Sequence, residues 1–205
     1  PGFAADIAGW CHSTCNQLVE IVPSGDGAYR ATVIRNDKQA CPVSAMPAEK
    51  KNKTIVVFSD DFDRAMAAFI IANGAASMGS TVTLFFTFWG LNILRNTQAP
   101  VVSKNVVEKM FGWMMPCGAE RLTLSKMNMG GMGTAMMKGI MKKKNAASLP
   151  ELIQSAQKQG VRLVACTMSM DLMGIKREEL IAGVEEGGVA MYLDQAESGN
   201  VNLFI

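Results

Sequence analysis

The stretch TIVVFSDDFDRAMAAFIIANGAASMGSTVTLFFTF, residues 54–88, decides the fold that the sequence predicts. It begins with a short β-branched run, continues with helical spacing of apolar residues, and ends in a second, continuously apolar run. Asp61 and Asp63 suit the first helical turn, where backbone N–H groups lack partners, and Gly79 suits the helix end. A strand that is apolar throughout is typical of a parallel sheet covered on both faces. The stretch therefore predicts a strand, a helix and a parallel strand.

The chain after residue 88 repeats this alternation. Ser148 and Glu151 have the spacing of a capping box at the start of one of the helices. Alternating strands and helices of these lengths predict an α/β fold with a mostly parallel sheet and helices on both faces. We expect helices at 103–115, 134–145, 148–160, 176–188 and 190–199, and strands at 120–126, 161–167 and 201–205.

The amino-terminal part has a different pattern. It predicts one helix over residues 4–16 and a β-hairpin over residues 17–34. A piece of this size cannot bury a useful core alone, so we expect a docked appendage or the remainder of a domain whose beginning has been removed. Residues 36–53 carry two prolines and no periodicity, which is typical of a linker. The predicted division is therefore 1–35, 36–53 and 54–205.

Composition excludes several classes of partner. The 205 residues are 49% hydrophobic and 19% charged with a net charge of +2, which is typical of a globular chain and does not favour nucleic acid. The one lysine cluster, residues 138–144, is expected to be a solvated helix face. Residues 65–94 carry no charge, but their apolar parts are split by Gly-containing segments, so a helix, a turn and a strand explain them better than a membrane span.

The five cysteines argue for a reducing, cytoplasmic compartment. Their number is odd and they form no regular C-x-x-C pairs, so we expect free thiols rather than a disulfide framework. Cys11, His12 and Cys15 are close in sequence but lack a convincing fourth ligand for zinc. A copper(I) site of methionine thioethers is disfavoured because histidines are lacking. We therefore expect no metal and no dissociable cofactor.

The positions of the methionines and aromatic residues predict a mobile lid or contacts with another subunit. Nine of the 16 methionines lie between Met110 and Met141, and we expect residues 127–141 to form a mobile lid or a subunit contact. The run FFTFWGLNIL, residues 85–94, holds more apolar bulk than one short buried strand accommodates. Part of it is expected to lie against another subunit, because monomers rarely expose large apolar patches.

Three motifs together resemble the methionine-rich branch of the DsrE/DsrF-like family of sulfur-relay proteins, over residues 53–205. This resemblance implies a Rossmann-like α/β domain that assembles as a trimer or a multiple of it and passes sulfane sulfur along as a cysteine persulfide. Cys166 matches the position of the family's working cysteine, after a central strand. The motifs are KTIVVFSDDFDRAMAAFIIANGAASMGSTVTLFFTFWGLNILR (53–95), KMNMGGMGTAMMK (126–138) and VRLVACTMSMDLMGI (161–175).

The segment PGFAADIAGWCHSTCNQLVEI, residues 1–21, resembles the carboxyl half of a TusA-like domain, a small α/β sandwich that also carries sulfur. The signature cysteine of that family, in a C-P-x-P motif, would precede Pro1, and Cys41 does not take its role. The resemblance implies a larger parent protein, since such modules are often fused to rhodanese or flavin disulfide-reductase domains.

Cys166 is the candidate catalytic residue. Sulfur transfer needs a thiolate, which helix N-termini and nearby cations favour, and a helical region is predicted to start just after this cysteine. The hydroxyls of Thr167 and Ser169 and the backbone N–H groups there are expected to stabilise an anionic sulfur. The alternative is that Cys166 is a small hydrophobic residue at the end of a buried strand.

Three further residues complete the predicted site. Cys117 sits in a Pro/Gly turn, MMPCGAE, and is either a second relay or resolving thiol or a loop cysteine without a role. Ser59 and Asp60 end the first strand of the sheet and are candidates for lining a substrate pocket at the same sheet edge as Cys166. Capping of the following helix explains Asp60 equally well.

These observations favour a sulfur carrier or sulfurtransferase that works between donor and acceptor protein thiols, such as those of rhodanese-like and TusA-like proteins. Two alternatives stay open. One is an oligomeric scaffold or regulatory module with an inert Cys166. The other is a thiol peroxidase or disulfide-reducing enzyme in which Cys117 resolves an oxidised Cys166.

Overall fold

The computed structural model describes residues 16–24, 28–35, 52–100 and 114–205, with the single positions Ile7, Cys11, Val102, Met110 and Gly112. The chain divides into two compact units, Pro1–Glu49 and Lys50–Ile205. The larger unit contains the whole of the predicted α/β domain.

The smaller unit contains the predicted hairpin. Strands β1 (Gln17–Pro23) and β2 (Tyr29–Ile34) pair antiparallel, with an irregularity between Leu18 and Glu20. Neither strand has a buried residue. The helix predicted over residues 4–16 lies outside the described residues except at Ile7 and Cys11, which are helical, and at Asn16.

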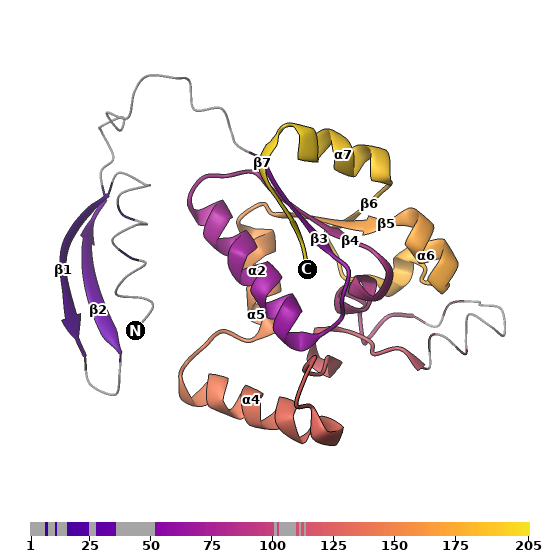
Figure 1. Cartoon of the computed structure of the whole chain (residues 1–205), viewed down its shortest axis with the longest axis horizontal. Coiled ribbons are helices and arrows are strands. Elements are labelled where there is room, and N and C mark those ends of the chain that lie inside the picture. Colours follow the sequence, from indigo (N-terminus) through magenta and orange to yellow (C-terminus); the bar gives the residue numbers. More distant parts are fainter. Residues whose placement is uncertain are drawn as a thin grey trace. The chain divides into compact units, whose positions relative to one another are not determined.

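The larger unit is built on a five-stranded sheet in the order β6-β5-β4-β3-β7 (Figure 1). Every neighbouring pair is parallel, which confirms the predicted fold class. Parallel pairing requires a crossover between strands, and the alternation of elements in the sequence supplies these crossovers. The strands are β3 (Asn52–Val57), β4 (Val82–Phe86), β5 (Arg162–Cys166), β6 (Val184–Gly187) and β7 (Gly199–Phe204).

Helices cover both faces of this sheet (Figure 1). Helices α2 (Phe62–Ser77) and α5 (Leu149–Lys158) bury the main core with side chains such as Phe69, Leu84 and Leu163. The opposite face carries a smaller cluster that packs against α7 (Val189–Glu197), a helix with no buried residue. Two further helices, α4 (Met132–Lys143) and α6 (Thr167–Met173), complete the described helical segments.

Residues 120–126 do not form the predicted strand. They contain the end of a 3-10 turn, η2 (Ala119–Arg121), followed by a loop. The loop's backbone groups are bonded outside any sheet: the Thr123 carbonyl accepts from Phe62 N–H at 2.8 Å, and Leu124 N–H donates to Thr134 Oγ1 at 2.9 Å. These backbone groups are already paired, so they are not available to a sheet. The segment therefore anchors the start of a helix and does not form a strand.

Residues 176–188 do not form the predicted helix either. A short 3-10 turn, η4 (Arg177–Glu179), is followed by a Gly183 turn with φ of 80° and then by β6. Arg162 Nη2 lies 2.6 Å from Glu185 Oε2 and joins β5 to β6 across the sheet. The charged residues suggested a helical face, but they belong to an edge strand, where charged side chains protect the open edge.

The apolar run at residues 85–94 is covered by the chain's own core. Strand β4 ends at Phe86, and the 3-10 segment η1 (Phe88–Leu94) turns back so that Leu91, Ile93 and Leu94 are buried. Trp89 stays 45% exposed. The aliphatic residues of this run are therefore buried within the chain, in η1 rather than in the strand, and the predicted contact with another subunit would involve the exposed Trp89.

Two further expectations concern helices. The helix predicted over residues 103–115 falls almost entirely outside the described residues. No helix in the described ranges has both the length and the apolar character that crossing a bilayer requires.

Candidate functional site

Cys166 lies where the predicted site placed it, at the carboxyl end of an interior strand. It is the last residue of β5, with β4 on one side and β6 on the other, and it is also the N-cap of α6. Its thiol is free. Ligands of parallel α/β sheets bind at this edge, so the position is suited to chemistry.

The Cys166 side chain is nevertheless buried, with 2% of its surface exposed. It belongs to a small cluster with Phe85 and Val164, and Met191 and Tyr192 of α7 pack against that cluster. The ring centroids of Phe85 and Tyr192 are 5.2 Å apart. Access to the thiol therefore depends on α7.

Gly187 shapes the cover over this cluster. It is the β6 residue directly opposite Cys166 in the sheet. A Cβ added at Gly187 would overlap the terminal methyl group of Met191 and crowd Val164. The absence of a side chain at position 187 therefore lets the Met191 thioether lie over the sheet beside Cys166.

Thr167 and Ser169 occupy the first turn of α6, as predicted. Ser169 is fully buried, and its hydroxyl lies 2.8 Å from Thr87 Oγ1 at the end of β4. Thr167 is half-buried. The Ser169 hydroxyl thus ties α6 to the neighbouring strand end, which fixes the backbone that follows Cys166.

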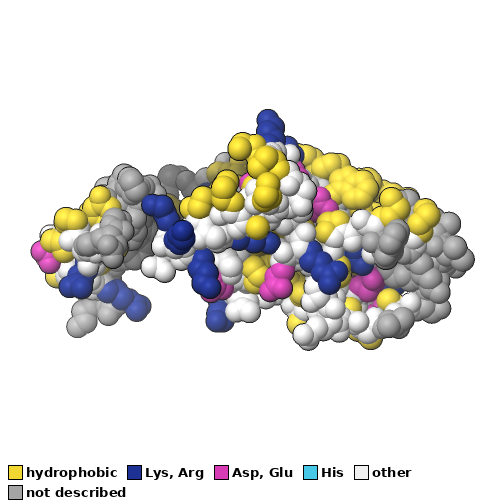
Figure 2. Space-filling view, turned by 90° about the horizontal axis from the view of Figure 1, so that it is seen from below, with side chains coloured by type: hydrophobic (Ala, Val, Ile, Leu, Met, Phe, Trp, Pro, Cys, Tyr) yellow, Lys and Arg dark blue, Asp and Glu magenta, His cyan; other side chains and the backbone are white. Residues whose placement is uncertain are grey.

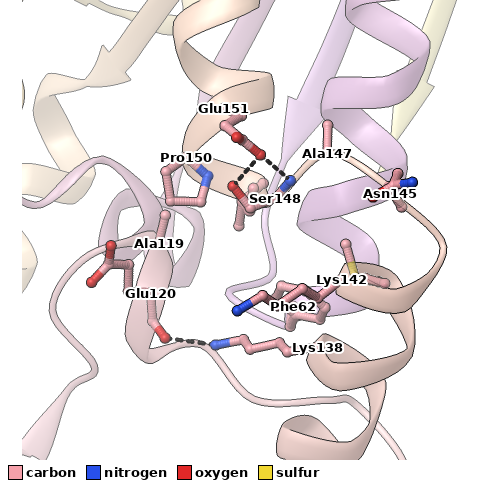
Figure 3. Close-up of a pocket in the computed structure, with 13 residues that line it drawn as sticks. Phe62, Ala119, Glu120, Lys138, Lys142, Asn145, Ala147, Ser148, Pro150 and Glu151 are labelled. Carbon is pink, nitrogen blue, oxygen red and sulfur yellow. Dashed lines mark hydrogen bonds between the residues drawn. The ribbon is translucent and has the colours of Figure 1, made fainter.

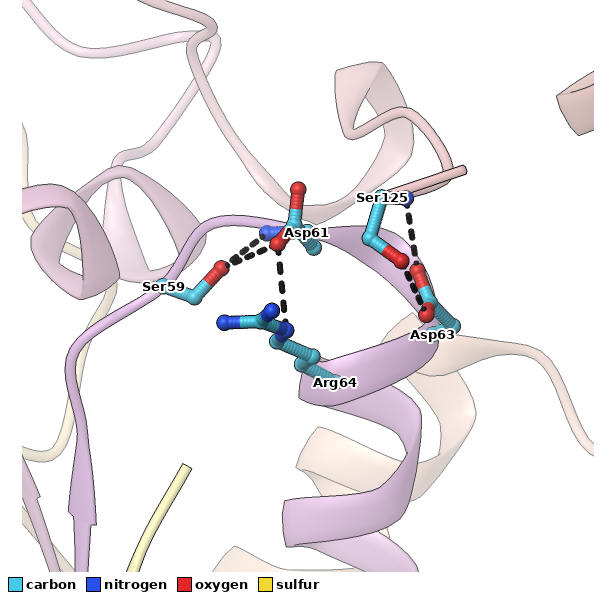
Figure 4. A network of polar contacts seen from close by, with 5 residues as sticks. All are labelled: Ser59, Asp61, Asp63, Arg64 and Ser125. Atoms are coloured by element: carbon cyan, nitrogen blue, oxygen red, sulfur yellow. Dashed lines mark hydrogen bonds and ion pairs between the residues drawn. The ribbon is translucent and has the colours of Figure 1, made fainter. Parts of the chain in front are cut away.

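Ser59 and Asp60 lie at the carboxyl end of β3 but bond away from Cys166. Ser59 Oγ donates to Asp61 Oδ2 at 2.6 Å and accepts from Asp61 N–H, in the polar network at the start of α2 (Figure 4). Asp60 Oδ2 accepts from Asn92 Nδ2 at 2.9 Å. The structure therefore assigns both residues contacts that position η1 and α2.

Cys117 is half-exposed and free, in a loop on η2's amino-terminal side. Its Sγ lies 3.8 Å from the Asn96 carbonyl oxygen, and nearby Met115 belongs to the main core. Cys166 belongs to the separate cluster under α7. No bond or cluster in the described part of the chain joins the two thiols.

A model of the DsrE/DsrF/DrsH-like family matches residues 49–204. The chain belongs to this family. Uncharacterized protein YrkE of Bacillus subtilis is 56% identical over 160 residues, which cover 78% of this chain and all of that protein. Sulfur carrier protein DsrE2 of Allochromatium vinosum is 36% identical over 161 residues, which cover 77% of this chain and 99% of that protein. The resemblance seen in the motifs is confirmed.

Two solved structures are also similar to this DsrE/DsrF/DrsH-like chain. The ychN protein from E. coli has a TM-score of 0.44 and 14% identity, over 75% of this chain and 99% of that one. Protein MTH1491 of Methanobacterium thermoautotrophicum has a TM-score of 0.42 and 16% identity, over 76% of this chain and 99% of that one.

A cavity of about 840 Å³ lies between α4 and the start of α5, and Cys166 is not among its lining residues (Figure 3). Lys138 reaches across it, donating to the Glu120 carbonyl at 2.7 Å with its ammonium 5.1 Å from the centre of the Phe62 ring. The helix N-terminus at Ser148 is already filled by a carboxylate: Glu151 accepts from the Ser148 N–H and hydroxyl, each at 2.7 Å.

Three carboxylates near helix or strand ends have shifted pKa values. Hydrogen bonds from the Ser148 backbone and side chain lower the pKa of Glu151. The Arg162 guanidinium lowers the pKa of Glu185. Partial burial acts to raise the pKa of Asp63, but hydrogen bonds from Ser125 outweigh it and the net shift is downward (Figure 4).

No metal centre is formed by the described residues, among which no group of three or more His, Cys, Asp or Glu side chains is placed to hold an ion. His12 and Cys15, which the sequence places close to Cys11 as possible zinc ligands, lie outside the described ranges. The residues that sequence reasoning missed are those over the thiol, Met191, Tyr192 and Gly187. The only available signal was the helical pattern at residues 190–199, which does not reveal the strand it covers.

Proposed function

We propose that this chain is a sulfur carrier of the DsrE/DsrF/DrsH-like family that holds sulfane sulfur as a persulfide on Cys166. The observation that carries the proposal is a free thiol at the carboxyl end of an interior parallel strand, where the next helix begins. The similarity to a relative named as a sulfur carrier supports the same role.

The transfer is a pair of displacements that conserves electrons. The Cys166 thiolate attacks the outer sulfur of a donor persulfide, R–S–SH, forming a new S–S bond as the donor's S–S bond breaks and R–S⁻ leaves. An acceptor thiolate then attacks the outer sulfur of Cys166–S–SH and releases the Cys166 thiolate. Each step exchanges one S–S bond for another, so no external oxidant or reductant is needed.

Burial of Cys166 gives α7 a part in this cycle. A donor sulfur must reach a thiol that Met191 and Tyr192 cover. No residue of α7 is fully buried, so opening of this helix breaks fewer apolar contacts than opening of α2 or α5 would, although it uncovers Phe85 and Val164. We therefore infer that α7 moves to admit the donor and closes over the loaded persulfide.

We propose the partners, the assembly and the compartment of the chain on the same basis. Donors and acceptors are rhodanese-like or TusA-like proteins, the chain assembles as a trimer or a multiple of it, and it works in the cytoplasm. Residues 1–35 form a TusA-like segment, joined by the linker 36–53 to the carrier domain. Cys117 serves as a second thiol only if the two cysteines approach each other.

Loading of Cys166 is the direct test. The full chain is incubated with glutathione persulfide, or with thiosulfate and a rhodanese, and its intact mass is measured. We expect a gain of one sulfur atom that dithiothreitol removes, that persists in Cys117→Ser, and that disappears in Cys166→Ser. Circular dichroism of Cys166→Ser checks that its fold is retained.

The scaffold alternative is favoured by one observation, the 2% exposure of Cys166. It predicts that no donor adds sulfur to the native chain, although iodoacetamide alkylates Cys166 after denaturation. That pair of results would exclude the carrier function. Dimedone trapping after peroxide treatment distinguishes the carrier and the scaffold from a peroxidase, which forms a sulfenic acid at Cys166.

A further inference from the structure

One surface of the larger unit exposes six large apolar side chains that all lie between residues 127 and 140. We call it the methionine face. Burial does not explain it, because each of these side chains is between 40% and 73% exposed. The methionine face consists of Met127, Met129, Met132, Met136, Met137 and Ile140.

Helical geometry gathers part of this face into a stripe. Met132, Met136 and Ile140 are spaced four residues apart along α4, so they project from the same side of the helix. The inward side is made by buried Gly133 and Thr134. Helix α4 is thus amphipathic, with its apolar stripe turned away from the domain.

The backbone holds two of the methionines outward at an energetic cost. Met127 and Met129 have φ of 58° and 44°, a left-handed conformation that disfavours side chains other than glycine. Neighbouring contacts enforce it: Thr134 Oγ1 donates to Asn128 Oδ1 at 2.9 Å, and a Cβ at Gly133 would overlap the Met127 carbonyl. Strain that exposes an apolar side chain indicates a function for that exposure.

Basic side chains predominate along the methionine face, although Glu120 and Glu151 lie with Lys138 and Lys142 around the neighbouring cavity. Residues 121–150 contain six Lys and Arg residues and no Asp or Glu. Lys142, Lys143 and Lys144 are exposed at the end of α4, and Lys126 is exposed beside Met127. Two carboxylates from outside this segment bond to it: Asp63 accepts from Ser125, and Glu151 accepts from Ser148. Figure 2, seen from the α4 side, shows hydrophobic side chains in yellow and basic ones in dark blue, with acidic ones in magenta between them.

We propose that the methionine face binds the surface of an anionic phospholipid bilayer. Apolar side chains on one side of a helix, flanked by lysines, are the pattern of interfacial membrane binding. The lysines bind the phosphate headgroups, and the methionines enter the boundary between headgroups and acyl chains. A second copy of the chain fits less well, because a face-to-face pair would place the two sets of cations against each other.

Vesicle sedimentation with the full chain tests this proposal. We expect binding to vesicles of phosphatidylcholine with phosphatidylglycerol, weaker binding at high salt, and none to pure phosphatidylcholine. Replacing Lys142, Lys143 and Lys144 by Gln should lower the partition coefficient roughly a hundredfold, since each lysine near an anionic surface contributes about fivefold. The control Lys158→Gln, on α5, should bind like the wild type.

A second variant separates binding from folding. Met127→Gly with Met129→Gly relieves the left-handed strain, so the chain should unfold at a higher temperature while its vesicle binding falls. The control Ile70→Ser removes an exposed apolar side chain from α2 and should leave binding unchanged.

Three outcomes would overturn the proposal. The first is no binding to anionic vesicles. The second is binding that neither substitution weakens. The third is binding to poly-L-glutamate beads that matches vesicle binding and does not depend on Met127 and Met129, which would assign the face to acidic proteins. A change in oligomeric state in place of vesicle binding would assign it to a second copy.

Discussion

At the scale of single residues, the surroundings of Cys166 include neighbours on α7 and β6. Gly187 opposite the cysteine leaves room for Met191, and Met191 with Tyr192 covers the cluster that contains the thiol. The accessibility of the thiol is therefore a property of the Met191 side chain as much as of the cysteine.

Truncation of this side chain should uncover the thiol. We expect Met191→Ala to raise the rate of Cys166 alkylation by iodoacetamide roughly tenfold, because less apolar contact opposes the opening of α7. The measurement is mass spectrometry of quenched time points. Leu193→Ala is the matched control, since Leu193 is on the same helix but 49% exposed, and it should alkylate at the wild-type rate. Equal rates in all three chains would show that α7 does not gate the thiol.

Sequence reasoning reached Cys166 but not its cover, for a physical reason. An apolar run that ends in a cysteine marks a strand end, whatever the rest of the fold. Met191 packs against the cluster that contains the thiol, next to Gly187, and Gly187 lies opposite Cys166 because residues 184–187 are a strand that pairs with β5. That pairing is a long-range property, and the local charge pattern of residues 176–188 predicted a helix instead.

At the scale of elements, the best predicted feature is the start of α5. The capping box of Ser148 and Glu151 is local in sequence, and the structure confirms it. The strand predicted at residues 120–126 failed because its backbone groups bond to α2 and to Thr134, contacts that no local pattern contains. Local chemistry was thus predictable, whereas tertiary hydrogen bonding was not.

The capping box gives a stability prediction with a defined pH dependence. Ser148→Ala should lower the unfolding temperature by about 3 °C at neutral pH, because one bond to Glu151 is lost. The pKa of Glu151 is lowered from 4.5 in the folded chain, so its contribution is complete above pH 4.5 and is lost as the pH falls through the lowered value. The difference between variant and wild type should therefore shrink in acid.

Thermal unfolding followed by circular dichroism at neutral and acidic pH measures this difference. Gln154→Ala, on the exposed side of the same helix, serves as the control and should not change with pH in the same way. A difference that stays constant or grows in acid would contradict the role assigned to Glu151.

At the scale of the whole molecule, one group of exposed apolar side chains outside the methionine face is aromatic. The Phe58 ring lies 5.7 Å from that of Phe204 and 5.6 Å from that of Phe88. Phe204 is 71% exposed and Trp89 is 45% exposed. We predict that the assembly implied by the family resemblance forms at this group of rings, at the carboxyl edge of the sheet.

Light scattering tests that assembly. We expect the wild type to have three times the mass of one chain, or a multiple of three, at micromolar concentration. Phe204→Ser with Trp89→Ser should dissociate this assembly. The two substitutions remove exposed apolar surface that association would otherwise bury. Ile70→Ser is the control. A monomeric wild type would refute the assembly.

The strand order has a consequence for how the domain comes to be folded. Strand β7, the last in the chain, lies beside β3, the first of the larger unit, and Ile205 exchanges backbone bonds with Val56 and Phe58. Contacts this distant in sequence slow folding, because a long loop must close before they form. On the ribosome, β3 must therefore wait without its outer neighbour until residues 199–204 have emerged, and its unpaired edge is open to other chains until then.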